Sequence, residues 1–187
     1  MALAKLTRPR LGRLLDRPRL FRLLDARRPL AWVWGPPGAG KTALVTGWLD
    51  ARRLRTLWFQ CDAGDTSADA FLDYLARAAG ASRRAAPVAG AAVRDCVREL
   101  FARLDAPFVL VLDDYHEIPG DSPVHEALRV AVDELPPGAR VVVTSRAEPP
   151  PAFVRLRASR AISDIGWTEL RLNAAESRAR NVDRANH

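Results

Sequence analysis

The sequence predicts an α/β fold in three layers, in which a mostly parallel sheet carries helices on both faces. Two observations lead to this prediction: short apolar runs alternate with amphipathic stretches, and the runs are continuous rather than alternating. Strands separated by helices favour right-handed crossovers and parallel pairing. Continuous Val and Leu runs are typical of strands buried on both faces. A chain of 187 residues is long enough for one such domain.

The predicted elements follow one another regularly after Pro29. Apolar runs predict strands over residues 30–34, 55–61, 108–112 and 139–143. Apolar residues at helical spacing predict helices over residues 41–51, 67–79, 91–104 and 122–135. The second of these helices is expected to be capped by Ser67 or Asp69. Residues 80–90 are rich in Ala, Arg and Pro, and we expect them to form a surface connection.

The first 28 residues are basic and contain a duplication. Nine basic and two acidic residues account for the whole formal net charge of +7. The stretch Arg8–Asp16 is followed at once by Arg17–Asp25, and eight of nine positions are identical. Leucines three and four residues apart predict a short helix in each copy. Asp16 is expected to cap the second helix, with Pro18 in its first turn.

A basic arm of this kind is able to bind nucleic acid. Arg outnumbers Lys by 27 to 2 over the whole chain, which favours a coding bias over a binding patch. The composition therefore sets a basic helical segment (1–28) apart from the rest of the chain.

Cysteine usage and hydropathy indicate the compartment. Cys61 and Cys96 cannot build a disulfide framework, so a reducing, cytoplasmic setting is expected. No apolar run approaches the ~18 residues that a membrane helix needs, and no membrane partner is expected. The first residues lack a continuous apolar segment, which argues against a secretory signal.

The strongest motif is GPPGAGKT over residues 35–42, between the first predicted strand and helix. Its glycines allow a tight loop whose N–H groups point at phosphate oxygens, and the following helix N-terminus favours anions. Lys41 is predicted to lie between the β- and γ-phosphates, and the Thr42 hydroxyl to bind Mg²⁺. The expected nucleotide-binding residues are Gly35, Pro36, Pro37, Gly38, Ala39, Gly40, Lys41, Thr42 and Ala43. The fold prediction thereby becomes a P-loop NTPase sandwich that binds a nucleotide with Mg²⁺.

Two other strands end in polar residues at the same edge of the predicted sheet. Asp113 is expected to hold Mg²⁺ through water, and Asp114 to orient or deprotonate the attacking water. Without the phosphate loop, this pair would read as a solvated acidic turn. Thr144 is expected to hydrogen-bond the same water and Arg146 to contact the γ-phosphate, although ion-paired arginines are common in so Arg-rich a chain. The expected catalytic residues are therefore Lys41, Asp114 and Arg146, and the expected metal-binding residues are Thr42 and Asp113.

Other nucleotide chemistries lack their motifs. The chain has no Asn-Lys-x-Asp for guanine selection and no Leu-Ser-Gly-Gly-Gln of the transporter type. Its three histidines are too scattered along the sequence to predict a metal site.

In their order and spacing, these motifs resemble the ATPase domain of MalT-like regulators, which are LuxR-type transcriptional activators of the STAND class of signal-transduction ATPases. The matching segments are WVWGPPGAGKT (32–42), WFQCDAGD (58–65), VLVLDDYHEI (109–118) and LPPGARVVVTSRAEPP (135–150). The resemblance runs from about Arg8 to Glu176, and it implies an ATPase domain over residues 29–176 followed by a tail over residues 177–187.

The resemblance implies a switch rather than a metabolic enzyme. Such proteins hold ADP at rest, exchange it for ATP and self-associate when an inducer acts, and reset by slow hydrolysis. The resemblance also places the Arg-Pro-Arg-Leu stretch near the nucleotide, and either Arg8 or Arg17 is able to occupy that position. Family members continue with a winged helix, a sensor region and a DNA-binding helix-turn-helix, which do not fit into residues 177–187. DNA binding and inducer sensing are therefore not expected of this chain alone.

Two alternatives remain open from the sequence. A small P-loop phosphotransferase would move the γ-phosphate to a metabolite, but it needs an acceptor pocket and a lid, for which only residues 80–90 are a candidate. A non-catalytic interaction module would retain the nucleotide for structural reasons only.

Overall fold

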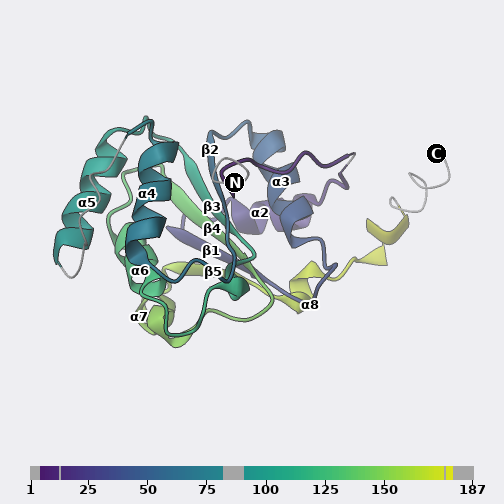
Figure 1. The fold of residues 1–187 in the computed structure, drawn as a ribbon. Helices are drawn as coiled ribbons and strands as arrows, with labels where there is room; N and C mark the ends of the chain where they lie inside the picture. The colour runs from purple at the N-terminus through teal and green to yellow at the C-terminus, as the bar shows by residue number, and fades with distance from the viewer. Residues whose placement is uncertain (1–4, 13, 82–90, 175, 179–187) are drawn as a thin grey trace.

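The computed structural model describes residues 5–12, 14–81, 91–174 and 176–178, and it contains a five-stranded sheet (Figure 1). The strands are β1 (Leu30–Trp34), β2 (Thr56–Gln60), β3 (Val109–Asp113), β4 (Arg140–Ser145) and β5 (Ile162–Ile165). Their order across the sheet is β2-β3-β4-β1-β5, and every neighbouring pair is parallel. The predicted parallel α/β fold is therefore confirmed.

Helices cover both faces of the sheet. They are α2 (Pro18–Leu24), α3 (Lys41–Arg52), α4 (Ala68–Ala78), α5 (Ala91–Ala102), α6 (Val124–Asp133), α7 (Val154–Ala158) and α8 (Trp167–Leu170), with 3₁₀ turns η1 (Tyr115–Glu117) and η2 (Pro151–Phe153). In Figure 1, α2 and α3 lie on one side of the sheet and α4 to α7 on the other. In the described part of the chain, no helix is both long and apolar enough to cross a membrane.

The two layers of helices explain why the strands are apolar at every position. Ala31 and Val33 of β1 belong to the core cluster with α2 and α3, whereas Leu30 and Trp32 belong to the cluster on the opposite face. Successive side chains of a strand point to opposite faces, so a strand covered on both sides buries both sets. Burying this apolar surface is the main favourable term in folding.

The strand order places a crevice at the carboxyl ends of the central strands. The chain leaves β1 for the far edge at β2 and returns through β3 and β4, and β5 then adds to the other side of β1. In open α/β sheets, ligands bind where the strand order reverses in this way. The register also matches Gln60 with Asp113 and Trp34 with Ser145, which sets the ends of these strands side by side.

Most predicted elements are confirmed with shifted ends. Helix α3 begins at Lys41, and the Ser67 hydroxyl accepts a hydrogen bond from the amide of Ala70 and caps α4. Strand β5 and the short helices α7 and α8 were not predicted. Most of the predicted connection, residues 82–90, lies outside the described residues.

The duplication does not give two equal helices. The second copy forms α2 with Pro18 in its first turn, as predicted, but the residue before the helix is Arg17 and no side chain caps it, so the prediction for Asp16 is wrong. The described residues of the first copy, 8–12 and 14–16, form no helix. The one difference between the copies explains this: Phe21 is buried in the core, whereas its counterpart Gly12 has no side chain to bury and disfavours a helix.

Candidate nucleotide-binding site

The loop between β1 and α3 turns sharply through two glycines. Gly38 and Gly40 have φ angles of +75° and +78°, in the left-handed region that glycine adopts without strain. Gly40 directly precedes α3, and no described side chain caps that helix. The first amides of a helix have no partner within the helix, and together with the helix dipole they attract anions. The loop therefore has the backbone conformation that its sequence predicts for a phosphate-binding loop.

Lys41 is buried at the start of α3, and its ammonium group folds back over the loop. Its Nζ donates hydrogen bonds to the carbonyl oxygens of Gly35 at 2.9 Å and Pro36 at 3.1 Å. Burial lowers the pKa of Lys41 below its ordinary value, and the nearby carboxylate of Asp114 partly opposes this. A phosphate oxygen forms a charge-assisted bond that is stronger than a bond to a neutral carbonyl.

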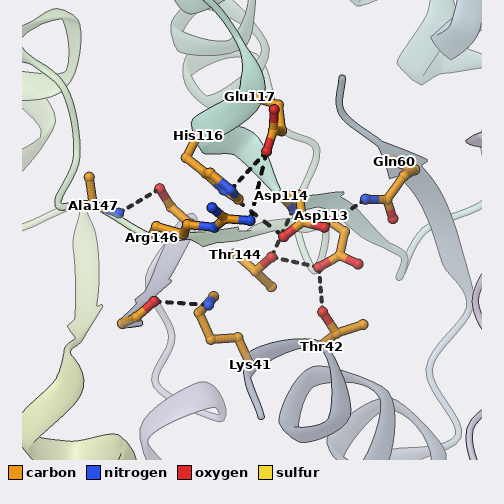
Figure 2. Close-up of polar contacts among 12 residues, drawn as sticks. Lys41, Thr42, Gln60, Asp113, Asp114, His116, Glu117, Thr144, Arg146 and Ala147 are labelled. Atoms are coloured by element: carbon orange, nitrogen blue, oxygen red, sulfur yellow. Dashed lines mark hydrogen bonds and ion pairs between the residues drawn. The ribbon is translucent and has the colours of Figure 1, made fainter. Parts of the chain in front are cut away.

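Asp113 lies buried at the end of β3, facing the first turn of α3. Its Oδ1 accepts hydrogen bonds from the hydroxyl of Thr42 at 2.9 Å and from the hydroxyl of Thr144 at 2.5 Å (Figure 2). Burial raises the pKa of Asp113, although both hydroxyl bonds act in the opposite direction. One carboxylate and one hydroxyl from distant segments thus meet beside the phosphate loop, and oxygen donors of this kind suit Mg²⁺.

Asp114 follows β3 in the left-handed conformation, with φ of 57°. Its Oδ2 accepts a hydrogen bond from Nε2 of Gln60 at 2.9 Å, and its amide donates to the Thr144 hydroxyl at 3.0 Å. The Thr144 hydroxyl is thus bonded to both acidic residues. Gln60 was missed by the sequence analysis, although it ends a predicted strand in the same way that Asp113 does.

Arg146 is exposed just beyond β4 and points toward η1 (Figure 2). Its Nη2 lies 4.0 Å from Oε1 of Glu117, and the same oxygen lies 3.1 Å from Nε2 of His116. Burial and the charge of Arg146 lower the pKa of His116. His116 and Glu117 were not predicted to belong to the site, because they lie on the turn after the strand rather than at its end.

A cavity of about 450 Å³ adjoins the phosphate loop on the side of α8. It is lined by Leu15, Arg17, Gly38, Ala39, Gly40, Ala43, Leu44, Trp167, Leu170, Arg171, Leu172 and Ser177. Arg17 of the second copy thus lines this cavity, together with Leu15 near the end of the first copy. Arg8 of the first copy lies against α3 instead, where it bonds the carbonyl oxygen of Thr46 and pairs with Asp50.

Sequence comparison identifies curated proteins that are similar to this chain. The MalT transcriptional regulators of Vibrio campbellii and Yersinia enterocolitica are 33% and 30% identical to the chain over 155 and 154 residues, which is 76% of the chain and 17% of each regulator. MalT from Cronobacter sakazakii is 32% identical over 161 residues. The chain thus spans less than a fifth of the length of these curated relatives.

Structure comparison supports the fold. Cdc6p from Pyrobaculum aerophilum superposes with a TM-score of 0.61 at 18% identity, over 84% of this chain and 46% of that one. The Aeropyrum pernix Orc1 protein, solved in complex with DNA, gives a TM-score of 0.53 at 17% identity, over 90% of this chain and 48% of that one. The family model of the AAA ATPase domain matches residues 10–144, which include the phosphate loop and the acidic end of β3. This chain therefore belongs to the AAA ATPase domain family and is similar to the MalT regulators.

Proposed function

We propose that this chain is an ATP-binding switch module of a MalT-like transcriptional regulator and that it hydrolyses ATP slowly. The observation that supports this most directly is the 2.9 Å hydrogen bond between the hydroxyl of Thr42 and the carboxylate of Asp113, at the mouth of the glycine-rich loop. Two oxygen ligands that are 71 residues apart in the sequence meet where phosphate and metal belong.

Each residue of the site has a proposed role. Residues 35–43 bind the phosphates through backbone amides, and the ammonium of Lys41 moves from the loop carbonyls to the β- and γ-phosphates. Thr42 and Asp113 hold Mg²⁺, which when bound neutralises charge on the phosphate oxygens. Asp114 orients or deprotonates the attacking water, and Gln60 holds the carboxylate of Asp114 in place.

The switch depends on contacts that ATP makes and ADP does not. A ligand shifts a conformational equilibrium only as far as its affinities for the two states differ. Arg146 is the residue proposed to make that difference through a contact with the γ-phosphate, because it is an exposed cation just beyond β4, at the same edge of the sheet as the loop. Its interaction with Glu117 is loose, at 4.0 Å between half-exposed groups, so moving Arg146 to a phosphate costs little.

The wider role of the chain is also part of the proposal. The relatives are transcriptional regulators, and the chain matches only a part of each. We propose residues 29–176 as the ATPase domain, preceded by the basic segment 1–28 and followed by the tail 177–187. Self-association is expected in the ATP state, DNA binding is not expected of this chain alone, and the cytoplasm is the expected location.

Nucleotide titration tests the site. Calorimetry with ATP and ADP, with and without Mg²⁺, should show binding to the wild type and none to Lys41→Ala. The chain offers a matched control, because its one other lysine, Lys5, pairs with Asp62 and Asp65 rather than with the loop. Lys5→Ala removes the same charge and should bind normally. Equal affinities of the wild type and Lys41→Ala would refute the site.

Incubation with γ-labelled ATP separates the switch from the other two functions. Release of inorganic phosphate without an acceptor supports slow hydrolysis. Transfer of the label that requires a metabolite would indicate a phosphotransferase instead. Stable binding without turnover would indicate a non-catalytic module.

A further inference from the structure

Trp167 exposes its indole at the wall of the cavity beside the phosphate loop. The residue is 42% exposed, whereas most large apolar side chains of the described part are buried. Three other large apolar residues are comparably exposed, namely Leu11, Leu23 and Val154, and none of them lines this cavity. An exposed aromatic ring beside a binding loop is suited to contact a ligand.

The position of Trp167 is fixed by the structure around α8. The helix starts directly after β5, and the amide of Gly166 donates a hydrogen bond to the Glu169 carboxylate at 3.0 Å. A Cβ on Gly166 would lie 2.9 Å from the Trp34 ring, so the chain passes close to that ring before the helix. Such close packing leaves α8 little freedom to shift.

Two arginines of the duplication hold the other end of the same helix. Arg17 donates from Nη2 to the carbonyl oxygen of Leu170 at 2.8 Å, and Arg19 donates from Nη2 to that of Glu169 at 2.7 Å. These bonds join α8 to the segment before β1. The helix that carries the indole is therefore held in place before any ligand arrives, which lowers the entropic cost of binding.

The chemistry of the cavity fits a neutral planar group. Its lining combines aliphatic and alanine side chains with Trp167, Ser177 and two arginines, Arg17 and Arg171, and no carboxylate is present among the lining residues that the structure describes. Arg17 is already bonded to the carbonyl oxygen of Leu170 and the carboxylate of Glu176. The phosphate loop also lines the cavity, through Gly38, Ala39 and Gly40. A ligand whose phosphates rest on that loop thus has an apolar space beside it, and a nucleobase is the planar part of such a ligand. Stacking of an aromatic side chain on a base strengthens nucleotide binding.

We propose that Trp167 stacks on the base of the bound nucleotide and supplies the part of the affinity that does not come from the phosphates. The proposal rests on the nucleotide-binding function proposed above. In this proposal, α8 after β5 contacts the base, and the loop after β1 contacts the phosphates.

Calorimetric titration with two probes, ATP and inorganic tripolyphosphate, tests this proposal. Trp167→Ala should weaken ATP binding by roughly 5- to 100-fold, the range that base–aromatic stacking gives. It should leave tripolyphosphate binding unchanged. Trp167→Phe should recover most of the ATP affinity, because it keeps a ring. Leu23→Ala, which shortens another exposed apolar side chain away from the cavity, should bind both probes as the wild type does.

The outcomes separate this proposal from the function on which it rests. Lys41→Ala should lose both probes, and a wild type that binds neither would overturn the nucleotide site and the stacking with it. Unchanged ATP affinity of Trp167→Ala would overturn the stacking alone, and so would an equal loss for both probes. Indole fluorescence gives a second readout that does not depend on the alanine variant. ATP but not tripolyphosphate should change the emission of the wild type, and this change should be absent from Trp167→Phe.

Discussion

The duplication supplies a matched pair of arginines for a stability experiment. Arg8 and Arg17 occupy the same position of the two copies, but their surroundings differ. Arg17 is buried, with a side chain 7% exposed, and its Nη2 bonds the carbonyl oxygen of Leu170 and the carboxylate of Glu176, which is equally buried. Arg8 is 27% exposed and pairs with Asp50, whose side chain is 64% exposed. We therefore predict that Arg17→Ala destabilises the protein far more than Arg8→Ala.

The magnitude follows from what each substitution leaves behind. Removing one partner of a buried ion pair costs about 3–5 kcal/mol, because a charge remains buried without compensation. Glu176 would keep the amide of Asn173 at 3.0 Å and Arg19 at 3.4 Å, so the cost should lie at the lower end of that range, about 3 kcal/mol. An exposed pair such as that of Arg8 contributes about 0–1 kcal/mol.

The loss of stability in both variants is measured by urea unfolding, followed by circular dichroism. Urea is uncharged and therefore does not screen the ion pairs. With a urea dependence of about 2 kcal/mol/M, Arg17→Ala should lower the midpoint by about 1.5 M and Arg8→Ala by less than about 0.5 M. The double variant Arg17→Met with Glu176→Met removes both charges, and it should recover much of the loss.

Two results would refute this reasoning. Equal midpoints for the two single variants would mean that Arg17 is solvated rather than buried against α8. A double variant as unstable as Arg17→Ala would mean that the loss arises from packing and not from an unpaired carboxylate.

Three further predictions concern Asp113 and Arg146 of the site and Glu176, the partner of Arg17. Asp113→Asn keeps acceptors for both hydroxyls but lacks the charge, so addition of Mg²⁺ should no longer strengthen ATP binding in calorimetry. Arg146→Ala should weaken ATP binding about tenfold or more and leave ADP binding unchanged, since a charge-assisted bond to the γ-phosphate is lost; equal losses for both nucleotides would contradict its role. For Glu176, burial raises the pKa, but Arg17 and the amide of Asn173 outweigh it and lower the pKa below its ordinary 4.5. Its stabilisation is therefore present above pH 4.5 and lost as the pH falls through the lower folded value, and Glu176→Gln should flatten the dependence of the unfolding free energy on pH in that range.

The central strands and the phosphate loop were predictable because their signals are local. A strand buried on both faces is apolar at each position, and a loop that binds phosphate needs glycines and a lysine in sequence. Strand β5 carries no such signal, because Ser163 and Asp164 interrupt its two isoleucines at the edge of the sheet. Its place is set by pairing with β1, which no local pattern reveals.

The residues around the phosphate loop and the acidic end of β3 could not be predicted, for a related reason. Arg17 precedes the helix whose Phe21 is buried in the core, and it lines the cavity beside the loop, whereas Arg8 is held on α3 by Thr46 and Asp50. No local pattern distinguishes these two outcomes. Gln60 is different, because the rule that the carboxyl ends of parallel strands lie at one edge also covers the end of β2, whereas the prediction used it only for the ends of β3 and β4. The sequence thus predicts the groups proposed to contact phosphate, and the tertiary structure decides which groups surround them.

The contacts within the site bear on how a nucleotide would switch it. Lys41 is bonded to loop carbonyls, Thr42 to Asp113, and Asp114 to Gln60, so a ligand exchanges partners at each position instead of meeting bare charges. Such exchange lowers the net gain from each new bond, because only the difference between the old and new partner counts. The gain is largest where the old partner is weakest, and the interaction of Arg146 with Glu117 at 4.0 Å is the loosest of these. The γ-phosphate, which alone distinguishes ATP from ADP, is therefore expected to meet the residue that is least costly to recruit, and this favours a switch that responds to the third phosphate.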